Sequence, residues 1–268
     1  MAGFNDPAFY GDRWAAVYDE RHAHVDPEPA VDFLSVLAGN GRVLELAIGT
    51  GRVALPLAAR GVTVEGVDAS AAMVERTRER ASATGLRVEA MTMDGQELAF
   101  SGASFDAAIS ILGVILFPDA VRGLSELRRV VRPGGRIALV TWTAPEAYEL
   151  IGELRAAALS VLGSLPTRPL PAQLRFKERA QFQELFAAAG LPTAEISDVS
   201  AELVAPSPAW LAERLTFAPG MTALLEGFGG ARAEIVAAFR KRLETLRGTG
   251  RISLAARAHV GSVTVTQV

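Results

Sequence analysis

The sequence of 268 residues contains no cysteine. That absence excludes disulfide bonds, cysteine-ligated zinc sites and every mechanism that needs a thiolate nucleophile. Lysine is almost as scarce, with only Lys177 and Lys241, and the formal net charge is −3. No long basic run occurs, so nucleic acid, whose phosphates attract concentrated positive charge, is not an expected partner.

Long apolar runs are also missing. The longest, residues 107–117, is interrupted by Ser110 and is too short to cross a bilayer. The first residues lack the basic region and the apolar core of a secretory signal. We therefore expect a soluble, cytoplasmic protein with no membrane partner, acting as a monomer or a homodimer.

The sequence does contain a strand, a glycine turn and a helix start between Val43 and Arg52. Glycine, here Gly49 and Gly51, allows positive φ and a close approach of other atoms because it has no Cβ. The free N–H groups of a first helical turn then face whatever lies above them. The stretch predicts a cradle for the sugar and polar tail of a nucleotide-like ligand.

Apolar strands and helices alternate around this turn, which predicts an α/β fold: a parallel sheet with helices on both faces. Strands are expected at 43–47, 62–67, 87–93, 105–112 and 136–142, and the helices between them at 51–60, 70–83 and 119–131. A turn is expected at residues 133–135. Ser70 suits the start of the second of these helices and Gly85 its end.

The pattern changes after residue 145. Helices are expected at 146–162, 178–189, 208–217 and 231–247, with strands at 193–204 and in the tail 252–268, and two helices, 12–21 and 28–38, precede the first strand. We expect three parts. They are an N-terminal helical strap over the ligand site (1–40), a cofactor-binding core (41–144), and a helical substrate lobe with the last two strands (145–268).

The glycine turn alone leaves the cofactor open between NAD and S-adenosylmethionine. With Ala54 at the third position, the turn fits the relaxed dinucleotide fingerprint, and Asp68 follows where a carboxylate accepts from both ribose hydroxyls. Glu45, just before the turn, suits a cationic ligand, and Asp94 can accept from an adenine amino group. These carboxylates, and five strands before the helical insert, favour S-adenosylmethionine.

Five motifs follow one another between residues 40 and 145. They are 45–52 (Glu-Leu-Ala-Ile-Gly-Thr-Gly-Arg), 67–70 (Val-Asp-Ala-Ser), 93–100, 105–110 and 127–137. On these motifs the chain resembles the class I S-adenosylmethionine-dependent methyltransferases of the ubiquinone/menaquinone-biosynthesis-like group. The resemblance implies a Rossmann-like, mostly parallel seven-stranded sheet with an antiparallel last strand and a helical lid insertion. It also implies S-adenosyl-L-methionine as cofactor, S-adenosyl-L-homocysteine as product, and no metal.

The resemblance implies a role for each cofactor-binding position. Contacts with the methionine portion and ribose would come from Glu45, Ala47, Gly49, Gly51 and Asp68. The other implied positions are Ala69 and Met73 around the adenine, Asp94, Gly95 and Gln96 at its edge, and Ser110 and Ile111 beneath the sulfonium. Tyr18 either packs the N-terminal helix onto the lobe or lines the cofactor site. The family usually has glycine at position 47. Alanine adopts most of the same backbone positions if φ is negative, so we expect binding to survive.

Methyl transfer needs alignment and exclusion of water, and it needs a general base only when the acceptor arrives protonated. His22 and His24, after the first helix, are the candidate bases, ahead of His259. A solvated or structurally hydrogen-bonded imidazole is the plainer interpretation of each. The end of the fourth strand has neither the carboxylates of metal-assisted catechol methylation nor an Asn/Asp-Pro-Pro-Tyr run. An O, N or C atom of a small molecule therefore remains the expected acceptor.

The lobe is apolar, which favours a moderately apolar, natural-product or quinone-like small-molecule substrate. Its candidate lining residues are Phe176, Phe182, Phe186, Leu215, Phe217 and Met221. Trp142 either packs in the core or contacts substrate, and Arg76, Arg78 and Arg80 are expected to form a solvated helix face. Two alternatives stay open. One is an NAD-dependent oxidoreductase, and the other is a protein with this fold that binds the cofactor but catalyses another reaction.

Overall fold

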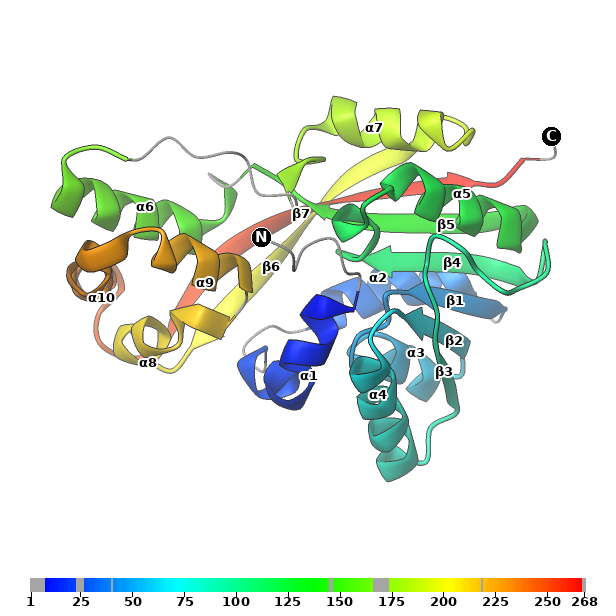
Figure 1. Cartoon of the computed structure of the whole chain (residues 1–268), viewed down its shortest axis with the longest axis horizontal. Coiled ribbons are helices and arrows are strands. Elements are labelled where there is room, and N and C mark those ends of the chain that lie inside the picture. Colours follow the sequence, from blue (N-terminus) through cyan, green and yellow to red (C-terminus); the bar gives the residue numbers. More distant parts are fainter. Residues whose placement is uncertain are drawn as a thin grey trace.

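The structure, a computed structural model, describes residues 8–22, 27–39, 41–144, 147–165, 174–217 and 219–266. At its centre is a seven-stranded sheet in the order β3-β2-β1-β4-β5-β7-β6 (Figure 1). The strands are β1 (Arg42–Leu46), β2 (Thr63–Asp68), β3 (Val88–Thr92), β4 (Phe105–Ile111), β5 (Val131–Trp142), β6 (Glu195–Ala205) and β7 (Ile252–Thr264). Neighbouring strands from β3 to β5 are parallel, and β7 runs antiparallel to both β5 and β6. The predicted sheet, including its antiparallel last strand, is confirmed.

The helices lie close to their predicted positions. They are α1 (Phe9–Arg21), α2 (Glu28–Ala38), α3 (Ala54–Ala59), α4 (Ala71–Thr84), α5 (Ala120–Val130), α6 (Glu149–Leu162), α7 (Arg179–Ala188), α8 (Pro208–Glu213), α9 (Pro219–Glu226) and α10 (Arg232–Arg247), with 3-10 turns η1 (Val114–Leu116), η4 (Leu215–Phe217) and η5 (Gly229–Ala231). Helix α4 begins as predicted, because Ser70 Oγ accepts the Met73 N–H at 3.2 Å, and it ends at Gly85 with φ +67°. Helix α9 was not among the predicted helices.

The glycine pair in β5 does not form the predicted turn. The strand runs without a break from Val131 to Trp142, and its register with β4 shifts between Phe105 and Ala107. A Cβ on Gly135 would lie 2.6 Å from the Asp106 carbonyl oxygen. The prediction of a turn was wrong because the chain bulges against its neighbour instead of reversing.

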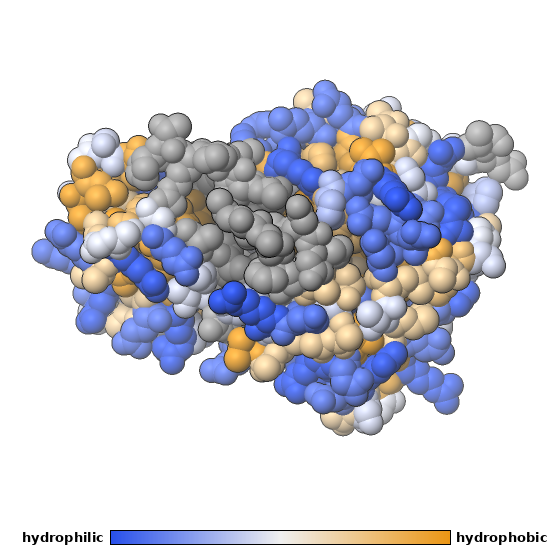
Figure 2. Space-filling view, in the orientation of Figure 1, coloured by the Kyte–Doolittle hydropathy of each residue, from blue (hydrophilic) through white to orange (hydrophobic). Residues whose placement is uncertain are grey.

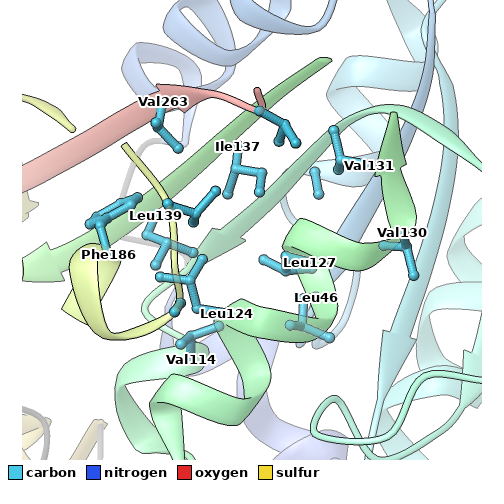
Figure 3. Close-up of a cluster of buried hydrophobic side chains, with 14 of the residues drawn as sticks. Leu46, Val114, Leu124, Leu127, Val130, Val131, Ile137, Leu139, Phe186 and Val263 are labelled. Carbon is cyan, nitrogen blue, oxygen red and sulfur yellow. The ribbon is translucent and has the colours of Figure 1, made fainter. Parts of the chain in front are cut away.

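Two apolar layers cover the sheet, and the predicted placement of helices on both faces is confirmed. Helices α2, α3 and α4 pack on one face through Leu34, Leu57 and Val74. Helices α5 and α7 pack on the other, where Leu124, Leu127 and Phe186 meet Leu46, Ile137, Leu139 and Val263 of the strands (Figure 3).

Phe182 and Phe186 belong to the second of these layers, so the prediction that they line a substrate site is wrong. Both side chains are fully buried against the sheet. A Cβ on Gly261 of β7 would lie 2.7 Å from the Phe186 ring. Glycine in β7 therefore lets α7 approach the sheet closely.

The far ends of β6 and β7 extend out of the sheet and carry a helical lobe made of α6, α8, α9 and α10 (Figure 1). The lobe has its own apolar cluster, in which Leu215 and Met221 are buried. The side chain of Phe217 lies outside the described residues. Apolar residues also reach the surface at the outer end of α6 (Figure 2), where Leu159 is 48% exposed. None of the described helices combines the length and the apolar character needed to cross a membrane.

Candidate functional site

The turn after β1 uses left-handed backbone at three positions. The φ angles are +61° at Ala47, +56° at Gly49 and +73° at Gly51. The premise that φ is negative at Ala47 is therefore wrong. Folding from β1 into α3 requires the left-handed region there, which costs a residue with a Cβ about 1 kcal/mol.

We expect Ala47→Gly to raise the free energy of unfolding by about 0.5–1 kcal/mol. The gain from relieving the positive φ exceeds the extra chain entropy that glycine brings to the unfolded state. Urea unfolding measures the difference. The matched control is Ala83→Gly on the exposed side of α4, where the same change should destabilise by about 1 kcal/mol. A loss of stability in Ala47→Gly would contradict this interpretation of the turn.

The end of β4 faces this turn. A Cβ on Gly113 would lie 2.4 Å from the Cβ of Ala47, and Leu112 has φ +58°. Two non-glycine residues with positive φ thus stand at the ends of β1 and β4, where the strand order reverses. In parallel sheets that position, beyond the carboxyl ends of the strands, is where ligands bind, and backbone strain of this kind gathers at functional sites.

Glu45 lies inside β1, one residue before its end, and is 3% exposed. The Ala54 N–H, at the start of α3, donates to its carboxyl group. Its other oxygen, Oε2, is buried without a hydrogen-bond partner among the described residues. The pKa of Glu45 is raised to about 8, chiefly by burial. The Ala54 N–H acts in the opposite direction, and the charge of Asp68 adds to the increase. A cationic group is the partner that this carboxyl group lacks.

Asp68 ends β2 and holds the glycine turn in place. Its Oδ2 accepts the Gly49 N–H and its Oδ1 accepts the Ser70 N–H, both at 2.9 Å. The Gly49 N–H is therefore already bonded within the protein. Burial raises the pKa of Asp68, against the two N–H groups that lower it. Each carboxylate oxygen keeps a further lone pair, so the group can still accept from two hydroxyls.

The loop after β3 carries the predicted adenine-edge residues. Asp94 is exposed, and its Oδ1 accepts from the Gln96 N–H at 2.8 Å and from the Gln96 side-chain amide at 3.1 Å. Gln96 Oε1 in turn accepts the Asp119 N–H at 2.8 Å. Gly95 is buried, and a Cβ there would lie 2.7 Å from the Phe117 ring. The loop is therefore held against the start of α5.

Ser110 fixes the residues that follow β4. Its hydroxyl donates to the Leu46 carbonyl at 2.8 Å and accepts the Val114 N–H at 3.1 Å. Ile111, on the other face of the sheet, is half-buried. The serine thus ties the carboxyl end of β1 to η1.

Helix α1 lies against the glycine turn and α4. Asp19 accepts from the Thr50 hydroxyl at 2.7 Å and pairs with Arg80 at 3.1 Å, while Arg80 also donates to the Thr50 carbonyl at 2.6 Å. Arg76 pairs with Asp19 at 3.4 Å. The arginine face predicted to be solvated therefore holds α1 in place through two of its members, and the third, Arg78, donates to the Ala90 carbonyl. Arg78 is exposed as predicted, and the side chains of Arg76 and Arg80 stay 43% and 32% exposed, so the face is partly solvated and also contacts α1.

A second contact joins the two helices near Asp68. Asp12 accepts from the Ser70 hydroxyl, and a Cβ on Gly11 would lie 2.3 Å from the Ser70 Cβ. Met73 is buried beneath this crossing, and Ala69 is half-buried beside it. The roles predicted for Met73 and Ala69 at an adenine ring remain predictions.

The candidate bases are placed unequally. His22 is half-buried, its ring stacks on that of Tyr18 with centroids 4.0 Å apart, and its Nδ1 lies 2.8 Å from the Tyr18 carbonyl oxygen. Burial raises the pKa of the Tyr18 hydroxyl, which the charge of Arg52 lowers. His24 lies outside the described residues. His259 is held by the Asp198 carboxylate at 2.6 Å and the Lys177 carbonyl at 3.1 Å, a structural arrangement.

Trp142, at the end of β5, stacks on Tyr148 with ring centroids 5.7 Å apart. Burial raises the pKa of the Tyr148 hydroxyl. The stack lies between the end of β5 and the start of α6. Sequence reasoning did not single out Tyr148.

Sequence reasoning also missed Asp12, Asp19, Thr50 and Arg175. Asp12 and Asp19 stand seven residues apart in one helix, so they lie on the same face, a spacing that could have revealed the contact with α4.

Among the described residues, three buried polar side-chain atoms lack a partner: Glu45 Oε2, Thr141 Oγ1 and Arg175 Nε. Glu45 and Thr141 each lie one residue before the carboxyl end of a strand, and Arg175 binds the turn after β4. The unsatisfied groups thus gather at the edge where ligands bind in such sheets. No cluster of metal-ligating side chains occurs in the described part of the chain.

Comparison with known proteins gives the following matches. A family model described as a methyltransferase domain matches residues 43–135. A phosphatidylethanolamine N-methyltransferase of Cereibacter sphaeroides is 36% identical over 149 residues, which are 54% of this chain and 72% of that protein. The chain spans about half (53%) of the length of the first curated relatives it matches, uncharacterised mycobacterial proteins that are 35% identical over 146 residues.

Two solved structures share the fold. Phosphoethanolamine N-methyltransferase 2 of Haemonchus contortus, in complex with S-adenosyl-L-methionine, has a TM-score of 0.58 at 18% identity, covering 100% of this chain and 61% of that one. The [4+2]-cyclase SpnF has a TM-score of 0.55 at 22% identity, covering 96% and 82%. At these identities the two structures are evidence for the architecture alone.

Proposed function

Because the chain belongs to the class I S-adenosylmethionine-dependent methyltransferases, we propose that it methylates an O, N or C atom of a small molecule. The acceptor is a moderately apolar compound of natural-product or quinone-like kind. The observation that carries the proposal is Glu45, whose buried Oε2 has no partner in the described residues. The amino group of S-adenosylmethionine is a cation of the kind that this oxygen lacks.

The residues present fit that cofactor. Glu45 would hold the amino group, Asp68 the ribose hydroxyls through its remaining lone pairs, and Asp94 the adenine edge. When bound, the cofactor supplies a methyl group on a sulfonium, already electrophilic. This chain's own task is to position the acceptor and exclude water.

Helix α1 and the lobe would perform that task. Helix α1 is joined to the glycine turn through Asp19 and Thr50, so it would close the cofactor side as the strap proposed for residues 1–40. The lobe, joined to the sheet by β6 and β7, would enclose the acceptor. A general base is needed only for a protonated acceptor, and His22 and His24 remain the candidates.

The alternatives are an NAD-dependent oxidoreductase and a cofactor-binding protein that catalyses another reaction. The sheet order, with antiparallel β7 between β5 and β6, differs from the parallel 3-2-1-4-5-6 order of dinucleotide-binding domains, which disfavours an NAD-dependent oxidoreductase. Because a fold does not fix a reaction, a protein that binds the cofactor and catalyses another reaction stays the second candidate.

Calorimetric titration with S-adenosylmethionine, S-adenosylhomocysteine and NAD in parallel tests the proposal. We expect micromolar binding of both adenosyl ligands and none of NAD. Binding of NAD alone would overturn the proposed cofactor. Turnover of S-adenosylmethionine with a panel of acceptors then separates a methyltransferase from the second candidate.

A further inference from the structure

Among the described residues, the Arg175 guanidinium has no ion-pair partner. Arg175 lies just before α7 and is half-buried. Its Nη2 donates to the main-chain carbonyls of Phe117 and Val114, at 2.5 and 3.4 Å, while Nε is buried and makes no hydrogen bond within the described residues. Burial lowers the pKa of Arg175, and only the more distant charge of Asp119 opposes this. A buried donor without an acceptor destabilises the protein, and a ligand that supplies an acceptor removes that cost.

The position of Arg175 links it to the site. Ser110 accepts the Val114 N–H at 3.1 Å, and Arg175 donates to the Val114 carbonyl, so a single residue of η1 joins the two side chains. Ser110 stands at the carboxyl end of β4, beneath the place proposed for the methyl group. The guanidinium and Ser110 therefore bind the same residue, at the edge of the sheet where the reaction centre is proposed.

The surroundings of Arg175 are apolar. Val114 and Ile115 are each 1% exposed, and the Phe176 ring lies 4.9 Å from the guanidinium carbon. A charge-assisted, bidentate bond to a guanidinium is strongest in such a setting, because water competes little for the donors. A neutral carbonyl could accept from Nε but would leave the charge without a counterion, whereas an anion supplies both an acceptor and a countercharge.

From this geometry we infer that Arg175 binds an anionic group of the acceptor, a carboxylate on a compact and otherwise apolar molecule. Arg175 is thus a specificity-determining residue, which the proposed function leaves open. The inference rests on the proposed function for the place of the reaction centre, but not for the binding of the anion itself.

Equilibrium binding to protein saturated with S-adenosylhomocysteine tests the inference. The probes are matched pairs of acid and methyl ester: 4-hydroxybenzoate, 4-hydroxyphenylacetate, indole-3-acetate and octanoate, with phenyl phosphate against phenol to separate phosphate from carboxylate recognition. We expect at least one acid to bind about tenfold or more tightly than its ester. A panel in which every pair binds alike, or none binds, would overturn the inference, and so would a preference for the phosphate alone.

Three variants test whether the preference for acid over ester comes from the Arg175 side chain. Arg175→Gln should bring the acid-to-ester ratio to within about threefold of unity, while Arg175→Lys should keep part of it through its charge. Arg87→Gln, an exposed arginine beside the amino end of β3, makes the same charge change at the opposite edge of the sheet and should leave the ratio unchanged. An acid preference that survives in Arg175→Gln would contradict the assignment.

The affinity for S-adenosylhomocysteine, measured for each variant, separates the two proposals. If wild type does not bind S-adenosylhomocysteine, the proposed function fails, and the acid and ester pairs measured without it still report on Arg175. If it binds and no acid is preferred, the inference about Arg175 alone fails. An unchanged affinity in Arg175→Gln also shows that the variant is folded.

Discussion

Glu45→Gln is expected to stabilise the ligand-free protein at pH 7 and to weaken its affinity for S-adenosylmethionine. Burial raises the pKa of Glu45 to about 8, from its ordinary value of 4.5 in the unfolded chain. Between these two values the folded state keeps a proton that the unfolded state releases. The free energy of unfolding must then fall as pH rises through this window, by up to about 1.4 kcal/mol per pH unit.

At pH 7 the accumulated cost reaches up to about 3 kcal/mol, and glutamine, which does not titrate, removes it. Urea unfolding between pH 5 and 8 should show this falling contribution in wild type and its loss in Glu45→Gln. The control is Glu89→Gln, an exposed position in β3 with the same charge change. A Glu45→Gln protein less stable than wild type at pH 7 would contradict the raised pKa.

In Glu45→Gln the affinity for S-adenosylmethionine should fall, although the stability rises. A bound ammonium group requires the Glu45 carboxylate, so binding at pH 6.5, where α-amino groups carry their proton, should release close to one proton. Titration calorimetry in two buffers of different ionisation enthalpy measures that release. Glu45→Gln should abolish it and weaken binding by about 100-fold, the value of a buried charge-assisted hydrogen bond. An affinity equal to that of wild type would remove Glu45 from the cofactor site.

Asp68→Asn should weaken binding of S-adenosylhomocysteine by about 100-fold, because two charge-assisted hydrogen bonds to ribose hydroxyls are lost or reduced. The amide cannot replace the carboxylate, since its NH2 group must face either the Gly49 N–H or the Ser70 N–H, each of which now donates at 2.9 Å. The glycine turn should therefore loosen as well, at a cost of about 1–3 kcal/mol in the free energy of unfolding.

Calorimetric titration and urea unfolding of the same preparations measure the two effects of Asp68→Asn. The control is Asp32→Asn on α2, whose side chain is exposed and pairs with Arg60 at the surface. Loss of stability without loss of affinity would assign Asp68 to the turn alone. Unchanged affinity and stability together would contradict both roles.

The sequence by itself determined the features that depend on local spacing. Alternating apolar strands and helices, with glycines at the turns, predicted the seven-stranded sheet and its helices on both faces. The cap at Ser70 and the stop at Gly85 were predictable because they act within one turn of their own helix. Glu45, Asp68 and Asp94 could be identified because the ends of parallel strands meet at one edge, so position along each strand fixes the place in space.

Contacts between distant segments were decided by the tertiary structure alone. Asp19 meets Thr50, 31 residues later, and Arg80, 61 residues later, so arginines that the sequence assigned to a solvated face also hold α1 against α4. Phe182 and Phe186 have the composition of a substrate lining, and only the packing of α7 on β7 shows that they belong to the core.

Two features depend on geometry that residue type does not specify. The positive φ of Ala47 follows from the path of the chain between β1 and α3, which a Cβ makes costly but does not prevent. Arg175 is one of many arginines in the sequence, and the fold sets it apart by burying its Nε without a hydrogen bond to any described residue. Burial and partnership are properties of the folded chain, because they arise from segments that only folding brings together.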